Sequence, residues 1–251
     1  MGKQNEIFER TEKKYRLNAK QYNAFINGVE GKIKEDQYGT HTISNIYYDT
    51  DDYELIRHSL DKPKYKEKFR IRGYGIISNE STVFLELKKK FNGIVYKRRA
   101  SMTYKQMNRY LVNGVLPDGR QHEQQILKEI QYFLSYYNPG PKVFLAYERT
   151  AFEGTTDPSL RITFDQNIRS RGRDLDLICG DYGRVLNEPA YLMEIKVFYA
   201  YPVWLSRLLA ELEIYPVSFS KYGTIYKQFI SNSKSGESEE EELCLQAHLA
   251  V

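Results

Sequence analysis

The sequence predicts an α+β fold in which an eight-stranded antiparallel sheet closes into a barrel and helices pack outside it. Tyrosine and phenylalanine are abundant, at 22 and 12 residues, and aromatic residues favour strands over a helical bundle. Charged side chains recur on every second residue in several runs, which places them on one face of a strand. Asn92-Gly93 separates two such runs and is a strong hairpin signal.

The first half of the chain contains most of the predicted strands. The first strand covers residues 8–17, and Asn18 can cap the helix that follows because Gln21 stands three residues later. Further strands are predicted, in order, over 42–50, 64–72, 82–90 and 94–102. A polar helix near 104–112 is closed by Gly114.

The second half begins with a helix over 122–137, HEQQILKEIQYFLSYY, whose apolar residues share one helical face. Asn138-Pro139-Gly140 ends it. Three more strands are predicted over 142–152, 160–165 and 190–198. A helical pattern over 203–214 leads to residues 218–230, where Ser220 can cap a final helix.

The composition is that of a soluble globular protein. Of the 251 residues, 41% are hydrophobic and 28% are charged. No apolar run approaches the roughly 20 residues of a membrane helix, and the N-terminus lacks the apolar region of a secretory signal. Cys179 and Cys244 have no metal-type spacing, so we expect neither a disulfide framework nor a zinc site. We therefore expect a cytoplasmic location.

The charge is unevenly distributed. Residues 231–251 carry a net charge of −4 against +4 for the whole chain, which leaves +8 on the preceding residues. We therefore divide the chain into a basic domain over 1–230 and an acidic tail over 231–251 that we expect to be disordered, either as a solubilising end or as a docking peptide. A basic domain favours an anionic partner: nucleic acid, phosphorylated metabolites or an acidic membrane.

The segment KYKEKFRIR has one cationic face as a strand. Its alternate residues are Lys64, Lys66, Lys68, Arg70 and Arg72. The same alternation occurs in Arg10, Glu12 and Lys14; Glu86, Lys88 and Lys90; Lys97 and Arg99; Tyr147 and Arg149; Arg161, Thr163 and Asp165; and Glu194 and Lys196. In an open sheet these faces would be solvated; in a closed barrel they would line a charged lumen. Since like charges repel when desolvated, such a lumen needs a polyanion inside.

Eight motifs carry a resemblance to a known family. In order they are ERTEKKY, KFRIRGYG, FLELKKK, YKRRA, YERTAF, LRITFD, MEIKV and FSKYG. Over about residues 8–230 the chain resembles the catalytic domain of the vacuolar transporter chaperone (VTC) family, within the triphosphate tunnel metalloenzymes and related to the CYTH proteins. The resemblance implies an eight-stranded antiparallel tunnel and the polymerisation of inorganic polyphosphate from ATP.

The resemblance also implies roles for individual residues. The catalytic positions are Arg70, Arg72, Lys88, Arg149 and Lys221. The substrate-binding positions are Lys14, Lys68, Lys97, Arg99, Tyr147, Arg161, Lys196 and Ser220. A Mn²⁺ or Mg²⁺ ion is expected on Glu194, with Glu86 as a second metal residue. Arginine and lysine side chains suit phosphoryl transfer, because guanidinium forks and ammonium groups hold phosphate oxygens while the acceptor chain supplies the attacking oxygen.

One departure and several alternatives stay open. The CYTH signature ExExK appears here as Arg10-x-Glu12-x-Lys14, which weakens the inference to cyclases and phosphatases with glutamate-rich metal sites. Glu86 and Glu194 can also be ion-pair partners of nearby cations, Tyr147 a packing residue and Ser220 only a helix cap.

The alternative functions are a metal-dependent triphosphatase or polyphosphatase of the same fold, and a non-catalytic polyphosphate or nucleotide binder. Nucleic acid is not expected as a partner, because the cations are phased inward and no RNA-binding or helix-turn-helix signature occurs. Any membrane partner is expected to be a separate protein, through which the chain would be peripheral to the membrane. The oligomeric state is not predicted.

Overall fold

The computed structural model describes residues 10–115, 117 and 121–230; the predicted acidic tail lies outside them. Eight long strands form the sheet: β1 (Arg10–Leu17), β3 (His41–Asp49), β4 (Tyr65–Tyr74), β5 (Thr82–Phe91), β6 (Ile94–Thr103), β7 (Gly140–Gly154), β8 (Arg161–Arg171) and β10 (Tyr191–Phe198). Three short strands add to it: β2 (Ile33–Glu35), β9 (Arg184–Val185) and β11 (Pro216–Val217). The helices are α1 (Ala19–Gly28), α2 (Glu54–Leu60), α3 (Tyr104–Asn113), α4 (Gln121–Tyr137), α5 (Val203–Glu211) and α6 (Lys221–Ile225), which continues as a π-helical turn over Tyr226–Ile230.

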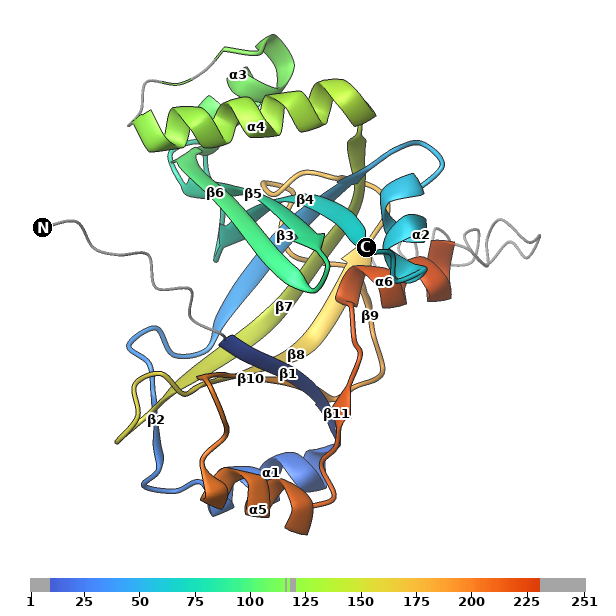
Figure 1. The fold of residues 1–251 in the computed structure, drawn as a ribbon. Coiled ribbons are helices and arrows are strands. Elements are labelled where there is room, and N and C mark those ends of the chain that lie inside the picture. Colours follow the sequence, from blue (N-terminus) through green and yellow to red (C-terminus); the bar gives the residue numbers. More distant parts are fainter. Residues whose placement is uncertain (1–9, 116, 118–120, 231–251) are drawn as a thin grey trace, which may run out of the picture.

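All strand pairs are antiparallel, and the sheet is strongly curved (Figure 1). Its order is β11-β1-β10-β8-β7-β3-β4-β5-β6, with β2 beside β7 and β9 beside β8. The predicted α+β class and the eight long strands are confirmed. The hydrogen-bonded path of the described residues is open, however, because β1 pairs with β11 at Lys14 and Tyr15 rather than with β6.

Local sequence signals account for several element ends. Asn18 and Gln21 form the predicted capping box of α1. Asn92 and Gly93 have φ values of 47° and 89°, and positive φ at both central residues is what a two-residue type I′ hairpin requires. Gly114 ends α3 with φ 67°, as glycine does at left-handed helix ends.

Other elements depend on distant residues and were not predicted. Helix α2 begins at a left-handed Tyr53 without a side-chain cap. Its second and third backbone amides, those of Leu55 and Ile56, instead donate to the Asp49 carboxylate at the end of β3, at 2.9 and 3.0 Å. Strand β8 continues to Arg171, beyond the predicted end at residue 165, because it stays paired with β7 and gains β9 as a partner.

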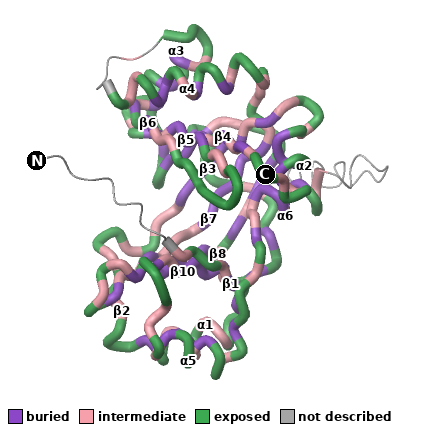
Figure 2. The backbone as a smooth tube through the Cα atoms, viewed as in Figure 1, coloured by how far each residue is buried: buried purple, intermediate pink, exposed green. Residues whose placement is uncertain are grey.

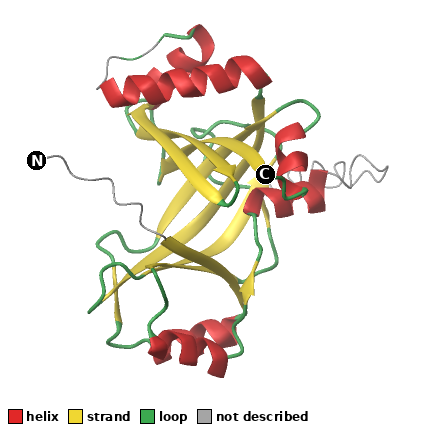
Figure 3. Cartoon of the chain, in the orientation of Figure 1, coloured by secondary structure: helices red, strands yellow, loops and turns green. Residues whose placement is uncertain are grey.

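Helices cover the outer face of the sheet (Figure 3). Helices α3 and α4 pack on β4, β5 and β6 through a core that includes Phe69, Leu85 and Ile130. Helices α1 and α5 pack on β1, β8 and β10 through Phe25, Phe164 and Leu205. Since each of these strands turns its apolar residues outward, its charged residues are left on the inner face.

The inner face is not charged throughout. Beneath α2 and α6 it is apolar, with Val143, Leu145 and Leu192 of the sheet packed against Phe219 and Tyr222. Figure 2 shows the buried residues concentrated along the strands, with exposed residues at the loops and outer helix faces. The charged residues therefore gather in a defined part of the inner face, next to this apolar part.

Candidate active site

Glu86 of β5 lies at the centre of an arginine cluster. It is 2% exposed, and Arg70 of β4 donates to its Oε2 at 2.7 Å. Arg99 of β6 donates from Nε to Oε1 at 2.7 Å, and Lys97 Nζ lies 2.9 Å from the same oxygen. Arg72 Nε is 3.7 Å from Oε2. Burial raises the pKa of Glu86, but these cations outweigh it and hold the pKa well below its usual range.

The two central arginines are also braced from β3. Arg70 Nη1 donates to the Tyr47 hydroxyl at 2.9 Å, and Arg72 Nε donates to Asn45 Oδ1 at 3.0 Å. Asn45 in turn donates to the Leu145 carbonyl at 3.1 Å. Fixed guanidinium groups can hold phosphate oxygens without first losing side-chain freedom. Sequence reasoning did not select Tyr47 or Asn45, although a polar Asn45 within an apolar strand was an available signal.

A second cluster surrounds Asp165 of β8. Arg149 of β7 donates to both carboxylate oxygens, at 2.6 and 2.8 Å, and Lys221 of α6 donates to Oδ2. Burial raises the pKa of Asp165, but Lys221 and Arg149 lower it below its usual range. The Tyr147 ring lies under Lys221, with Nζ 4.3 Å from its centroid. Asp165 was seen in the charged alternation of its strand but was not selected as a site residue.

Glu194 of β10 forms a third cluster. Its Oε1 pairs with Lys196, whose Nζ is also 3.8 Å from Glu12 Oε2. Burial raises the pKa of Glu194, whereas Lys196 and Lys14 lower it, and the result is about 2. Thr163 of β8 is the direct neighbour of Glu194 across the sheet. Among the described residues, Thr163 Oγ1 is the buried side-chain oxygen without a hydrogen-bond partner.

Lysines of β1, β4 and β5 meet near the start of α6. Lys14 Nζ donates to the Phe219 carbonyl at 3.1 Å, and Lys68 Nζ donates to Ser220 Oγ at 3.3 Å. Lys68 is paired with Lys88 across β4 and β5. Burial, followed by the charges of Lys66, Lys14 and Lys88, lowers the pKa of Lys68 to about 7. These lysines repel one another, which favours an anion between them.

The structure brings most of the predicted site residues together. We call this inner surface the basic face: Lys14, Lys68, Arg70, Arg72, Lys88, Lys97, Arg99, Arg149, Lys196 and Lys221, with Glu86, Asp165 and Glu194 as its main acids. Side chains of this face also bond past a neighbouring strand: Arg72 Nη2 of β4 donates to the Tyr147 hydroxyl of β7 at 3.4 Å, across the intervening β3.

Three predicted residues have contacts of a different kind. Arg161 lies at the rim, 44% exposed, with its guanidinium 3.8 Å from Asp36 and 4.0 Å from Glu153. Ser220 caps α6 by accepting from Gly223 N at 3.2 Å, in addition to its contact with Lys68. Glu86 was predicted as a second metal residue, but both of its carboxylate oxygens pair with cations. Its contacts are those of an ion-pair partner, which was the alternative prediction.

A divalent ion fits Glu194 better than Glu86. The described residues contain no group of three or more His, Cys, Asp or Glu side chains that would bind a metal by themselves. Mg²⁺ is commonly held by one or two carboxylates together with substrate phosphates. Glu194 and Glu12 already share one cation, the Lys196 ammonium, and the unpartnered Thr163 hydroxyl is adjacent. This donor set suits such an ion.

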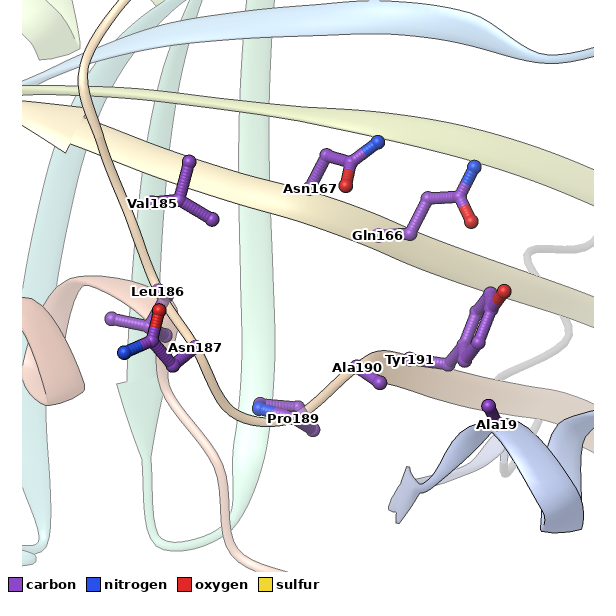
Figure 4. Close-up of a pocket in the computed structure, with 9 residues that line it drawn as sticks. All are labelled: Ala19, Gln166, Asn167, Val185, Leu186, Asn187, Pro189, Ala190 and Tyr191. Carbon is purple, nitrogen blue, oxygen red and sulfur yellow. The ribbon is translucent and has the colours of Figure 1, made fainter.

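A pocket of about 400 Å³ is lined by none of the residues of the basic face (Figure 4). Its lining residues are Ala19, Gln166, Asn167, Val185, Leu186, Asn187, Pro189, Ala190 and Tyr191. None of these carries a charge, and none is a predicted site residue. We therefore do not associate this pocket with a phosphate ligand. In the described part of the chain, no helix has the length and apolar character needed to span a bilayer.

Curated relatives match part of the chain. Subunit 4 of the vacuolar transporter chaperone complex of Schizosaccharomyces pombe is 29% identical over 146 residues, and subunit 2 of the Saccharomyces cerevisiae complex is 27% identical over 148 residues. Each match covers 50% of this chain but only 20% and 18% of the respective relatives. The matched half of this chain therefore spans about a fifth of the length of these relatives.

Solved structures share the fold. A putative adenylate cyclase of Bacillus halodurans matches with a TM-score of 0.53 and 15% identity, over 87% of this chain and 96% of that one. A putative adenylyl cyclase of Hippeastrum, described as having a dominant triphosphatase activity, matches with a TM-score of 0.50 and 13% identity, over 87% and 95%. At these identities the likeness concerns the fold alone.

The family model of the VTC domain matches residues 9–230, which include every strand and helix described above. The resemblance predicted from the eight sequence motifs is thus confirmed over nearly the whole folded part. The chain belongs to the VTC domain family.

Proposed function

We propose that this protein is a metal-dependent polyphosphate polymerase that transfers the γ-phosphoryl group of ATP to a growing inorganic polyphosphate chain. The observation that carries the proposal is the distribution of charge on the basic face. Its arginines are compensated by Glu86 and Asp165, whereas the neighbouring lysines of β4 and β5 have mainly other lysines as charged neighbours. This face thus offers more positive charge than a single triphosphate needs.

In the proposed reaction, a terminal oxygen of the acceptor chain attacks the γ-phosphorus. The bond to the β,γ-bridging oxygen breaks, and ADP leaves with that oxygen. Arg70 and Arg72 hold phosphate oxygens with their braced guanidinium groups, and Arg149 and Lys221 stabilise the charge that spreads over the transferred group. Lys14, Lys68 and Lys88 hold the acceptor chain as point charges.

Glu194, with Glu12 beside it, would hold a Mn²⁺ or Mg²⁺ ion together with phosphate oxygens. Such an ion supplies charge neutralisation at the transferred phosphoryl group. In this proposal Glu86 is the counter-charge that keeps Arg70, Arg72 and Arg99 folded against the sheet.

A second candidate is a metal-dependent triphosphatase or polyphosphatase, in which water replaces the acceptor chain. The fold is compatible with it, since a putative adenylyl cyclase of Hippeastrum, described as having a dominant triphosphatase activity, shares this fold. The relatives of the vacuolar transporter chaperone complex favour the polymerase, and also a separate protein partner at a membrane.

Incubation of the purified protein with ATP and either Mn²⁺ or Mg²⁺, followed by separation on a polyphosphate-resolving gel, tests the proposal. We expect long chains together with ADP. Arg70→Ala and Glu194→Ala should abolish both products, whereas Arg98→Ala, on the outer face beside Glu129, should leave them unchanged. Free phosphate without chains would identify the hydrolase, and binding of ATP or polyphosphate without any product would identify a non-catalytic binder.

A further inference from the structure

The tip of the β5–β6 hairpin exposes apolar side chains. Phe91, Ile94 and Val95 flank the Asn92-Gly93 turn and are 49%, 58% and 47% exposed. Tyr65, at the start of β4, is the strand neighbour of Phe91 and contacts its ring edge-on. Residues 91–97, which include this turn, are all exposed; Figure 2 colours the chain by this exposure. Large apolar side chains gathered on a surface in this way commonly mark an interaction site.

The same tip is surrounded by cations. The two segments that build it, residues 62–68 and 88–98, contain nine lysine and arginine residues and one carboxylate, the buried Glu67. Lys64 lies beside the turn, since its carbonyl accepts from Asn92 N at 2.9 Å. On the outer face Glu67 and Glu129 partly neutralise Lys89, and Glu129 also pairs with Arg98. Towards the inner face the charged neighbours of Lys66 are Lys90, Lys88 and Lys62.

We propose that this hairpin tip, together with Lys62 and Lys64, docks the protein on the surface of an anionic lipid bilayer. The apolar side chains would enter the boundary between headgroups and acyl chains, while the lysines contact the anionic headgroups. This combination of apolar burial and electrostatic attraction is what peripheral membrane binding requires. The proposal does not depend on the proposed polymerase activity.

The chemistry of the tip favours lipid over nucleic acid. A nucleic-acid surface needs cations and stacking or hydrogen-bonding groups, but it gives no advantage to exposed aliphatic side chains such as Ile94 and Val95. A bilayer rewards both features. Lys66 and Lys90, paired across β4 and β5, lie on the same strand face as Lys68 and Lys88. Docking at the tip would therefore bring the lysine-rich end of the basic face towards the membrane.

Vesicle flotation with the full chain tests the proposal. We expect the protein to float with phosphatidylcholine vesicles that contain phosphatidylserine and to stay in solution with phosphatidylcholine alone. Ile94→Asp/Val95→Asp should abolish flotation, and Lys62→Glu/Lys64→Glu should weaken it by more than tenfold, since each lysine near an anionic surface contributes about fivefold. None of these four residues belongs to the proposed catalytic site.

Matched controls carry the same changes elsewhere. Ile76→Asp, at a residue that is 99% exposed, and Lys105→Glu/Lys128→Glu, at exposed positions of α3 and α4, should leave flotation unchanged. Circular dichroism of each variant verifies folding. As a second measurement, the tryptophan fluorescence of Phe91→Trp should shift to shorter wavelength when anionic vesicles are added. The emission of Trp204 in the wild-type protein is the reference.

Three outcomes would overturn the proposal. Equal flotation with neutral and anionic vesicles, or an equal loss in the control lysine variant, would show that the tip has no specific role. Binding to single-stranded DNA that is lost in Lys62→Glu/Lys64→Glu but kept in Ile94→Asp/Val95→Asp, without flotation, would identify a nucleic-acid surface instead.

Discussion

Replacement of Glu86 by glutamine should destabilise the protein in a way that a polyanion repairs. Glu86 is the shared counter-charge of Arg70 and Arg72, whose Nε atoms lie 2.7 and 3.7 Å from Oε2. At an effective dielectric constant of about 20, these separations correspond to gross attractions of about 6 and about 4.5 kcal/mol. The side chains of Lys97 and Arg99 are 47% and 36% exposed, so solvent screens them and they contribute little more.

The net effect is smaller than these attractions because the ions were desolvated on folding. Removing one partner of a buried charge cluster typically costs about 3–5 kcal/mol, and we expect this loss in the unfolding free energy of Glu86→Gln. Tripolyphosphate should then stabilise the variant more than the wild type, because the released arginines bind it about tenfold more tightly, or about 1.4 kcal/mol.

Urea denaturation with and without tripolyphosphate, in the absence of metal, measures both effects. Glu129→Gln is the matched control: it pairs with Lys89 and Arg98 on the outer face, and its loss should cost less than about 1 kcal/mol. A comparably small loss for Glu86→Gln, or equal stabilisation of variant and wild type by tripolyphosphate, would refute the assignment of Glu86 as a counter-charge. In a parallel denaturation with Mg²⁺ and tripolyphosphate, loss of the Mg²⁺-dependent part of the stabilisation in Glu86→Gln would identify Glu86 as a metal ligand instead.

Three further substitutions have defined outcomes. Asp165→Asn should cost about 3–5 kcal/mol in urea denaturation, because it leaves Arg149 and Lys221 without their buried counter-charge; a loss below about 1 kcal/mol would contradict this role. Lys68→Met should raise the free energy of unfolding most at or below pH 7 and least near pH 10.5. The pKa of Lys68 is about 7 in the folded protein and 10.5 in the unfolded chain, so the cost of burying the charged ammonium is largest at low pH and disappears once the amine is neutral in both states. A pH-independent difference between variant and wild type would contradict the lowered pKa of Lys68. Glu194→Gln should abolish metal-dependent turnover while calorimetry still detects tripolyphosphate binding, and metal-stimulated activity in this variant would exclude Glu194 as the metal residue.

The fold was predictable where local chemistry decides it. The Asn18–Gln21 capping box, the Asn92-Gly93 turn and the helix stop at Gly114 each depend on residues that are close in sequence. Helix α2 was not predictable in this way, because its second and third amides bond to Asp49, which belongs to the preceding strand. That the hydrogen-bonded path of the described strands stays open, where a closed barrel was predicted, was likewise beyond the alternation pattern, which fixes the face of a residue but not which strand edges meet.

The candidate site was likewise predictable only in the part that depends on residues of a single strand. Alternation placed Arg70, Arg72 and Glu86 on one face, but only the register between β3, β4 and β5 reveals that Glu86 is surrounded by cations and that Asn45 braces Arg72. The role of Asp165 depends on α6, which is 56 residues away in sequence. A pattern within single strands contains no information on such contacts.

The most direct test of the polymerase is the fate of the γ-phosphoryl group. The protein would be given γ-labelled ATP, Mn²⁺ and a short polyphosphate primer, and the label in chains longer than the primer would be compared with the label in inorganic phosphate. Label that enters the chains, with ADP formed in equal amount and both lost in Arg70→Ala, is the expected result. Label found in inorganic phosphate alone, at the same rate with or without primer, would contradict the polymerase and identify a hydrolase.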